Sequence, residues 1–168
     1  GKSGSGKSVL TKCIVGLFEP DEGEIFYDER KLSDLKPKAR KEIRKEIGML
    51  FQASALFDSL TVEENVAFPL NMFTKMTKEE ISDRVNFCLN RVNIINKNEL
   101  FPSELSGGMQ KRVAIARAIA MQPKYLFCDE PNSGLDPVTA IVIDELIKEI
   151  TDEYNMTTIV ITHDMNLS

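Results

Sequence analysis

The stretch that decides the fold is Gly1-Lys2-Ser3-Gly4-Ser5-Gly6-Lys7-Ser8, which satisfies the pattern G-x-x-x-x-G-K-[ST]. Its glycines let the backbone wrap closely around an anion, so that successive N–H groups point at phosphate oxygens. The helix that follows adds the positive end of its dipole. The pattern predicts a phosphate-binding loop in which Lys7 reaches the β- and γ-phosphates of a nucleotide and the Ser8 hydroxyl ligates Mg²⁺.

Beyond this loop, short apolar segments alternate with helical patterns, which predicts an α/β fold with a largely parallel sheet. Strands are expected at 24–27, 47–51, 125–129 and 157–162, and helices at 7–18, 36–46, 62–72, 78–92, 106–121 and 136–152. The first helix would place Leu10, Ile14 and Leu17 or Phe18 on one face. Thr61 and Thr77 each precede a Glu by three residues, the pattern of a capping box. Asp136 and the proline after it form a strong helix start.

The proportions of hydrophobic and charged residues are typical of one globular domain. Hydrophobic residues make up 42% and charged residues 28% of the 168, which excludes a disordered or fibrous chain. The net charge of −5 argues against a protein whose main task is to grip nucleic-acid phosphates. No apolar run approaches the ~20 residues of a membrane-spanning helix. The three cysteines (Cys13, Cys88, Cys128) lack metal-type spacing and are expected to be free, buried thiols.

A pair of carboxylates, Asp129-Glu130, follows the apolar residues 125–128. Ligands of open α/β sheets bind outside the carboxyl ends of the strands, which is where this pair would lie. Asp129 could hold Mg²⁺ through water, and Glu130 could polarise an attacking water as general base. Taken alone, the pair could equally be an ordinary acidic exit from a strand.

Leu105-Ser106-Gly107-Gly108 is the third informative segment, because two glycines at a helix start are poor for helix stability. They make sense if bare backbone N–H groups approach a phosphate closely. At this point the chain resembles the ATP-binding cassette (ABC) ATPase family over essentially its whole length. The motifs occur in the family's order: the phosphate loop, Gln52, Leu105 to Gly108, Asp129-Glu130, Ser133-Gly134-Leu135-Asp136, and His163.

The resemblance implies a P-loop NTPase fold, with a mainly parallel, RecA-like sheet core and a helical subdomain inserted at about residues 54–122. It also implies ATP and Mg²⁺ as cofactors. Glu130, His163, Gln52 and Lys7 would serve catalysis, and Ser8, Gln52 and Asp129 would hold the metal. The signature segment, Leu105 to Met109, would contact the γ-phosphate of ATP held by a second copy of the chain. Ser133 to Asp136 would communicate across that dimer.

One position departs from the family pattern: Met109 stands where the signature carries Gln. The backbone donors are unaffected by this change, so it is interpreted as a subfamily mark. Met109 and the segment 56–70 together resemble the ATPase subunits of Mce/Mla-type systems. Those systems move phospholipids or other hydrophobic molecules between bacterial membranes. The alternative for segment 56–70 is an ordinary amphipathic helix.

By this resemblance the chain would power a transporter at the cytoplasmic face of the inner membrane, as a homodimer bound to transmembrane permease subunits and an Mce-domain protein. The alternative substrates are amino acids, as in methionine-type importers. A soluble ABC ATPase would carry a long coiled coil between Gln52 and Leu105, which segment 53–104 lacks. A non-catalytic nucleotide-binding module is a further alternative.

The chain opens directly on the phosphate loop and ends five residues after His163. A phosphate loop is normally held by the strand that leads into it. We therefore expect a domain truncated at both ends which, expressed alone, would be poorly stable and bind ATP weakly.

Overall fold

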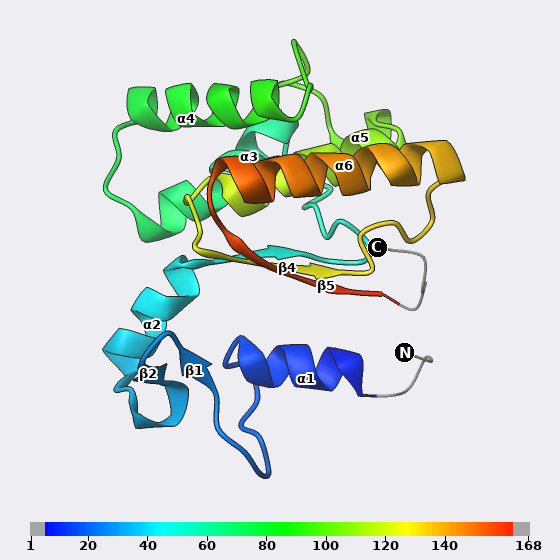
Figure 1. Ribbon diagram of the computed structural model, residues 1–168. Helices are drawn as coiled ribbons and strands as arrows, with labels where there is room; N and C mark the ends of the chain where they lie inside the picture. The colour runs from blue at the N-terminus through cyan, green and yellow to red at the C-terminus, as the bar shows by residue number, and fades with distance from the viewer. Residues whose placement is uncertain (1–5, 163–168) are drawn as a thin grey trace.

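A computed structural model describes residues 6–162. Strands alternate with helices as the sequence predicts, and Figure 1 shows their arrangement. The elements are α1 (Lys7–Ile14), β1 (Phe26–Tyr27), β2 (Arg30–Lys31), α2 (Pro37–Lys45), β3 (Ile47–Leu50), α3 (Val62–Phe73), α4 (Lys78–Arg91), α5 (Gly107–Ile119), β4 (Tyr125–Asp129), α6 (Pro137–Glu153) and β5 (Thr157–Ile161), with short 3-10 turns at Leu32–Asp34 and Pro102–Glu104.

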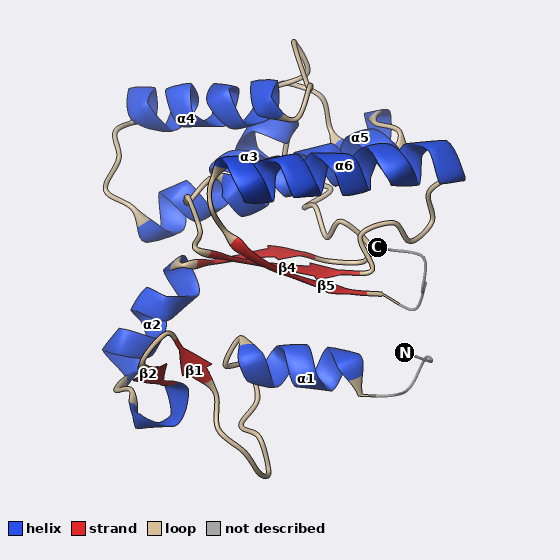
Figure 2. Ribbon diagram, viewed as in Figure 1, coloured by secondary structure: helices blue, strands red, loops and turns tan. Residues whose placement is uncertain are grey.

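The main sheet has the order β3-β4-β5 and is parallel throughout, as expected (Figure 2). Leu50 at the end of β3 pairs with Cys128, and Asp129 at the end of β4 pairs with Ile161. Because the strands are parallel and in this register, the segments that follow all three emerge at one edge of the sheet. That edge carries the glutamine and the two carboxylates predicted from the sequence.

Helices cover both faces of this sheet. In Figure 1, α3, α5 and α6 lie over one face and α1 lies on the other side. The central helix is α5, whose residues Val113 to Ala116 are at most 1% exposed. A Cβ at Gly48 would lie 2.6 Å from the carbonyl oxygen of Ala118, so β3 packs directly against the backbone of α5. All three cysteines are buried and free, as expected.

Both predicted capping boxes are present. The Thr61 hydroxyl accepts from the Glu64 amide at 3.2 Å and the Glu64 carboxylate accepts from the Thr61 amide at 2.8 Å, which starts α3. Thr77 and Glu80 start α4 in the same way. The helices α3, α4 and α5 pack on one another and share the main core. The limits of a separate helical subdomain stay a prediction.

The first helix is shorter than predicted. It ends at Ile14 instead of residue 18, because Gly16 adopts a left-handed conformation with φ 75° that stops the helix. Of the predicted apolar face, Leu10 and Leu17 are exposed, at 62% and 59%, whereas Ile14 is partly buried against the small core cluster of Tyr27, Leu32 and Ile43. The helix is held at its C-terminal end instead, where the Tyr27 hydroxyl donates to the Ile14 carbonyl at 2.7 Å.

Other predicted ends move by one or two residues, as is usual where helices and strands fray. The first strand begins at Phe26, β3 ends at Leu50, and β5 ends at Ile161. The helix predicted at 106–121 spans Gly107–Ile119, with Ser106 as its N-cap. The strand predicted to start at Tyr125 and end at Asp129 has those bounds in the structure.

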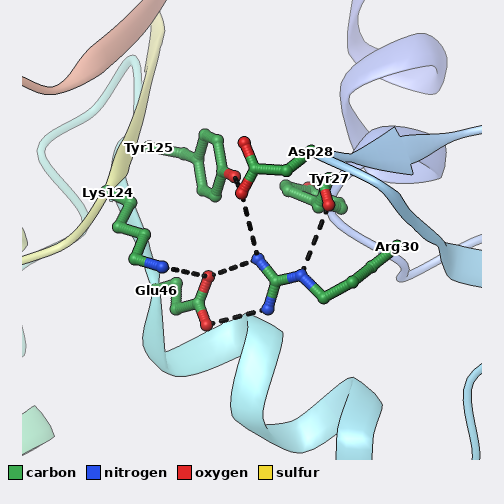
Figure 3. Close-up of polar contacts among 6 residues, drawn as sticks. All are labelled: Tyr27, Asp28, Arg30, Glu46, Lys124 and Tyr125. Carbon is green, nitrogen blue, oxygen red and sulfur yellow. Dashed lines mark hydrogen bonds and ion pairs between the residues drawn. The ribbon is translucent and has the colours of Figure 1, made fainter.

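A small antiparallel hairpin, β1-β2, was not predicted beyond its first strand, and a polar cluster ties it to β4 (Figure 3). Arg30 makes two hydrogen bonds to Glu46, at 2.9 and 2.7 Å. The Tyr125 hydroxyl donates to Asp28 at 2.7 Å, and the rings of Tyr27 and Tyr125 meet edge to face at 5.0 Å. The hairpin is thereby fixed beside the start of β3 and β4.

Candidate functional site

The N-terminal end of α1 has the features of an anion site. Gly6 precedes the helix with φ 85°, a backbone conformation that glycine adopts without strain. Its carbonyl accepts from the Leu10 amide at 2.9 Å, so the helix begins directly after the loop. The first turn contains no acidic residue, whereas α3 and α4 each begin with two. A helix end of this kind favours a negatively charged ligand.

Glu130 and Lys7 are brought together from distant parts of the chain. The Glu130 amide donates to the Ile161 carbonyl at 2.8 Å, which fixes Glu130 at the carboxyl edge of the sheet. Its backbone turns there through the left-handed region, with φ 47°. The Lys7 ammonium lies 3.9 Å from the Glu130 carboxylate, and both side chains are partly buried, 24% and 14% exposed. The predicted phosphate-binding lysine and the predicted base therefore share one site.

Gln52 follows β3 at the same edge and contacts the loop after Glu130. Its side-chain amide donates to the Ser133 hydroxyl at 3.0 Å, a contact between residues 81 positions apart. The Ser133 amide donates in turn to the Glu130 carbonyl at 3.0 Å. A hydrogen-bonded path thus connects the loop glutamine, the segment 133–136 and the backbone of Glu130.

The signature segment begins α5 and packs against the start of α6. Ser106 is the N-cap, and its hydroxyl accepts from the Met109 amide at 3.3 Å. A Cβ at Gly107 would lie 3.6 Å from Leu135, an ordinary contact, whereas a Cβ at Gly108 would lie 2.7 Å from the Thr139 methyl group. Close packing alone therefore requires glycine at 108, a reason that sequence reasoning did not anticipate.

Met109, the departure from the family signature, packs its side chain against the main core. Met109 therefore contributes apolar contact to the core, while its backbone amide takes part in the Ser106 cap. Gln110 donates from its side chain to the Pro102 carbonyl at 3.0 Å, which ties the helix start to the preceding turn.

Asp136 caps α6 as predicted. Its carboxylate accepts from the Thr139 hydroxyl at 2.6 Å and from the Thr139 amide at 3.0 Å. These two hydrogen bonds, the hydroxyl first, lower the pKa of Asp136 below its usual value. The side chain thus holds the helix start, in addition to any role across a dimer.

Two cations of α5 that the sequence analysis missed reach the loop of Gln52. Lys111 donates to the carbonyl oxygens of Phe51 and Gln52, and Arg117 donates to those of Ser54 and Ala55. A signal was present in the sequence, because Arg117 interrupts the otherwise apolar run from Val113 to Ala120. A cation in such a run is expected to have partners.

Several predicted positions lie outside the described residues: Gly1 to Ser5, His163 and the side chain of Ser8. Within the described part of the chain, no three His, Cys, Asp or Glu side chains gather as a metal cluster. The predicted Mg²⁺ set of a serine, a glutamine and Asp129 needs no such cluster, since Mg²⁺ in nucleotide sites takes few protein ligands and completes its shell with phosphate and water oxygens. No described helix is long and apolar enough to cross a bilayer.

Comparison with known proteins gives one consistent family. The sequence profile of the ABC transporter family matches residues 1–133. Over all 168 residues the chain is 41% identical to the "Probable ribonucleotide transport ATP-binding protein mkl" of Mycobacterium leprae, covering 48% of that protein. Over 167 residues, 99% of its length, it is 43% identical to the "Methionine import ATP-binding protein MetN 2" of Bacillus cereus, covering 49% of it. The chain thus spans about half the length of these curated relatives.

Solved structures agree with this assignment. The chain is similar to the ATP-binding cassette MJ0796, solved as a dimer in a post-hydrolysis state with ADP and Pi, with a TM-score of 0.85 and 39% identity, over 98% of this chain and 73% of that one. It is also similar to cbiO1 of Clostridium perfringens, part of the transporter complex cbiONQ, with a TM-score of 0.89 and 36% identity, over 99% and 66% of the two chains. With the fold and the motif order in agreement, the chain belongs to the ABC transporter family as one of its ATP-binding domains.

Proposed function

We propose that this chain is the ATP-binding and ATP-hydrolysing part of an ABC transporter. The observation that carries the proposal is the 3.9 Å approach of the Lys7 ammonium to the Glu130 carboxylate at the carboxyl edge of a parallel sheet. Lysine at the end of a phosphate loop and a carboxylate at the end of a buried strand are groups that phosphoryl transfer to water uses. Family membership supports the same reaction.

The residue roles that we propose follow the order of the motifs in the sequence. Backbone N–H groups of the phosphate loop and the start of α1 bind the phosphates, and Lys7 neutralises the β- and γ-phosphate charge. Ser8, Asp129 and Gln52 would hold Mg²⁺, which would offset charge on the transferring phosphoryl group. Glu130 accepts the proton of the attacking water, and His163 positions that water by the γ-phosphate.

The functional unit is a head-to-tail dimer. ATP lies between the phosphate loop of one copy and the segment Leu105 to Met109 of the other, with Ser133 to Asp136 at the contact between copies. The similar cassette MJ0796 was solved as a dimer, which supports this arrangement. ATP binding closes the dimer and hydrolysis reopens it, and the helices α3 to α5 pass the movement to transmembrane permease subunits on the cytoplasmic side of the membrane.

The substrate we propose is hydrophobic, a phospholipid moved by an Mce/Mla-like system, on the basis of Met109 and the segment 56–70. The alternative is an amino acid such as methionine, since one relative is named for methionine import. Co-purification separates the two: a permease with an Mce-domain protein would support the lipid substrate, and an amino-acid permease with its binding protein would refute it.

ATP turnover by the complete protein tests the function itself. Mg²⁺-dependent release of phosphate from ATP is expected, with loss of nucleotide binding in Lys7→Ala because the phosphate charge is no longer neutralised. Stoichiometric ATP binding without turnover, in the presence of the transporter partners, would instead show a non-catalytic nucleotide-binding module.

A further inference from the structure

The loop that carries Gln52 is a strained turn. Ser54 and Ala55 adopt left-handed conformations in succession, with φ 60° and 49°. Each such residue costs free energy unless the surroundings impose it. Within the loop, the Ser54 amide donates to the Phe51 carbonyl at 3.0 Å and the Ala55 amide donates to the Ala53 carbonyl at 2.7 Å. These two hydrogen bonds within the loop leave most of its carbonyl groups to be bound by donors from other segments.

That support comes from one helix. Lys111 donates to the Phe51 carbonyl at 3.2 Å and also to the Gln52 carbonyl. Arg117 donates to the Ala55 carbonyl at 2.8 Å and to the Ser54 carbonyl at 2.9 Å. Two cations of α5 therefore bind the carbonyls on both sides of the turn.

Burial of the Lys111 ammonium beneath the Gln52 loop has a desolvation cost in free energy. The residue is 3% exposed, and burial lowers the pKa of Lys111, as it does for Arg117. In the part of the chain that the structure describes, no carboxylate opposes this effect on either cation. A methionine or leucine would fill the same space without the desolvation cost. A cation here must therefore be explained by the carbonyls that it holds.

We propose that Lys111 is a positioning residue for Gln52: it fixes the backbone of the loop glutamine to the helix whose first turn carries the signature segment. Arg117 fixes the far side of the same turn. This inference rests on the proposed function, in which Gln52 serves the nucleotide of its own chain and the signature segment serves that of the partner copy. Because α5 carries the signature segment and also holds the Gln52 backbone, a shift of the signature segment on contact with the partner's ATP would move Gln52 relative to the nucleotide of its own chain.

The test compares variants of the complete protein. Lys111→Met removes the ammonium and keeps the length of the side chain, and Lys111→Arg keeps the charge. Arg112→Met is the matched control, because Arg112 also donates from α5 to a backbone carbonyl, that of Val92 at 3.0 Å, away from the Gln52 loop. Hydrogen exchange of the segment 51–56 and steady-state ATP hydrolysis are measured for each variant.

Lys111→Met should speed exchange in segment 51–56 by about tenfold or more, since a hydrogen bond to a charged donor is lost. The value of kcat should fall on the order of ten- to a hundredfold, as expected for misplacement of a reacting group, while KM for ATP changes less than about threefold. Lys111→Arg should restore most of kcat, and Arg112→Met should leave the exchange and kcat unchanged.

Unchanged exchange in Lys111→Met, an unchanged kcat, or an equal effect of Arg112→Met would overturn the inference. If Lys111→Met does not fold, as judged by circular dichroism, Lys111→Gln replaces it, with a smaller change in the same direction expected. The exchange readout needs no turnover, so it decides the role of Lys111 even if wild-type protein proves unable to hydrolyse ATP. Failure of the proposed function would instead appear in the wild-type protein itself.

Discussion

Replacing Gly108 by alanine tests the packing of the signature helix most sharply. The added Cβ would lie 2.7 Å from the Thr139 methyl group, well inside the ordinary carbon–carbon contact of about 3.5–4 Å. Thr139 cannot rotate the methyl group away cheaply, because its hydroxyl donates to Asp136 at 2.6 Å and its amide to the same carboxylate at 3.0 Å. The start of α5 or of α6 must shift to accommodate it.

The expected change in the free energy of unfolding follows from two opposing effects. Overpacking costs about 1–3 kcal/mol, and replacing glycine in a helix by alanine gains about 0.5–1 kcal/mol. Gly107→Ala has the same helix gain without the clash, because its nearest contact would be 3.6 Å. Gly108→Ala should therefore be about 1–3 kcal/mol less stable than Gly107→Ala, a difference of several degrees in Tm for a domain of this size.

Thermal unfolding of the complete protein followed by circular dichroism measures this difference. Thr139→Ser keeps the hydroxyl that caps α6 and removes the methyl group, so the double variant Gly108→Ala/Thr139→Ser should recover most of the lost stability. Equal Tm values for the two alanine variants, or no recovery in the double variant, would refute the packing explanation of Gly108.

Two further predictions concern stability. Asn65 is fully buried and makes four hydrogen bonds to the backbone of Phe57, Leu60 and Thr61. Asn65→Ala should lower the free energy of unfolding in denaturant by about 2–4 kcal/mol, and a loss below about 1 kcal/mol would show that the turn is held otherwise. The pKa of Glu46 is lowered in the folded protein, mainly by the hydrogen bonds from Arg30. The ionised Glu46 carboxylate therefore contributes its full stabilisation of the fold above the unfolded-state pKa. This contribution is lost as the pH falls through the lower folded-state pKa. The difference in Tm between wild type and Glu46→Gln should shrink as the pH is lowered from about 5 to 3, and a difference independent of pH would contradict this.

Features of the fold and of the site that depend on neighbouring residues could be predicted from the sequence. Because Asp129 ends one strand of a parallel sheet, Glu130 follows it, and Gln52 comes shortly after another strand, their position at one edge of the sheet could be predicted. The capping boxes at Thr61 and Thr77 were equally local signals. In each case the determining contact lies within a few residues or is imposed by parallel pairing.

The features that were missed depend on contacts between distant segments. The clash that requires glycine at 108 comes from Thr139, and the partners of Lys111 are carbonyls about 60 positions earlier. No local sequence pattern predicts contacts between segments that are so far apart in the chain. In α1, the helical period of the apolar residues does not by itself say which of them is buried: Leu10 is 62% exposed, and the helix is held at its last turn by the Tyr27 hydroxyl.

The measurement that tests the central claim most directly is ATP turnover and ATP-dependent dimerisation of Glu130→Gln in the complete protein. Glu145→Gln is the matched control, since Glu145 is an exposed carboxylate on α6. If Glu130 is the base, Glu130→Gln should bind ATP, accumulate as a dimer with ATP on size-exclusion chromatography, and hydrolyse ATP on the order of a hundredfold or more slowly, while Glu145→Gln behaves as wild type. Hydrolysis by Glu130→Gln at the wild-type rate would contradict the account.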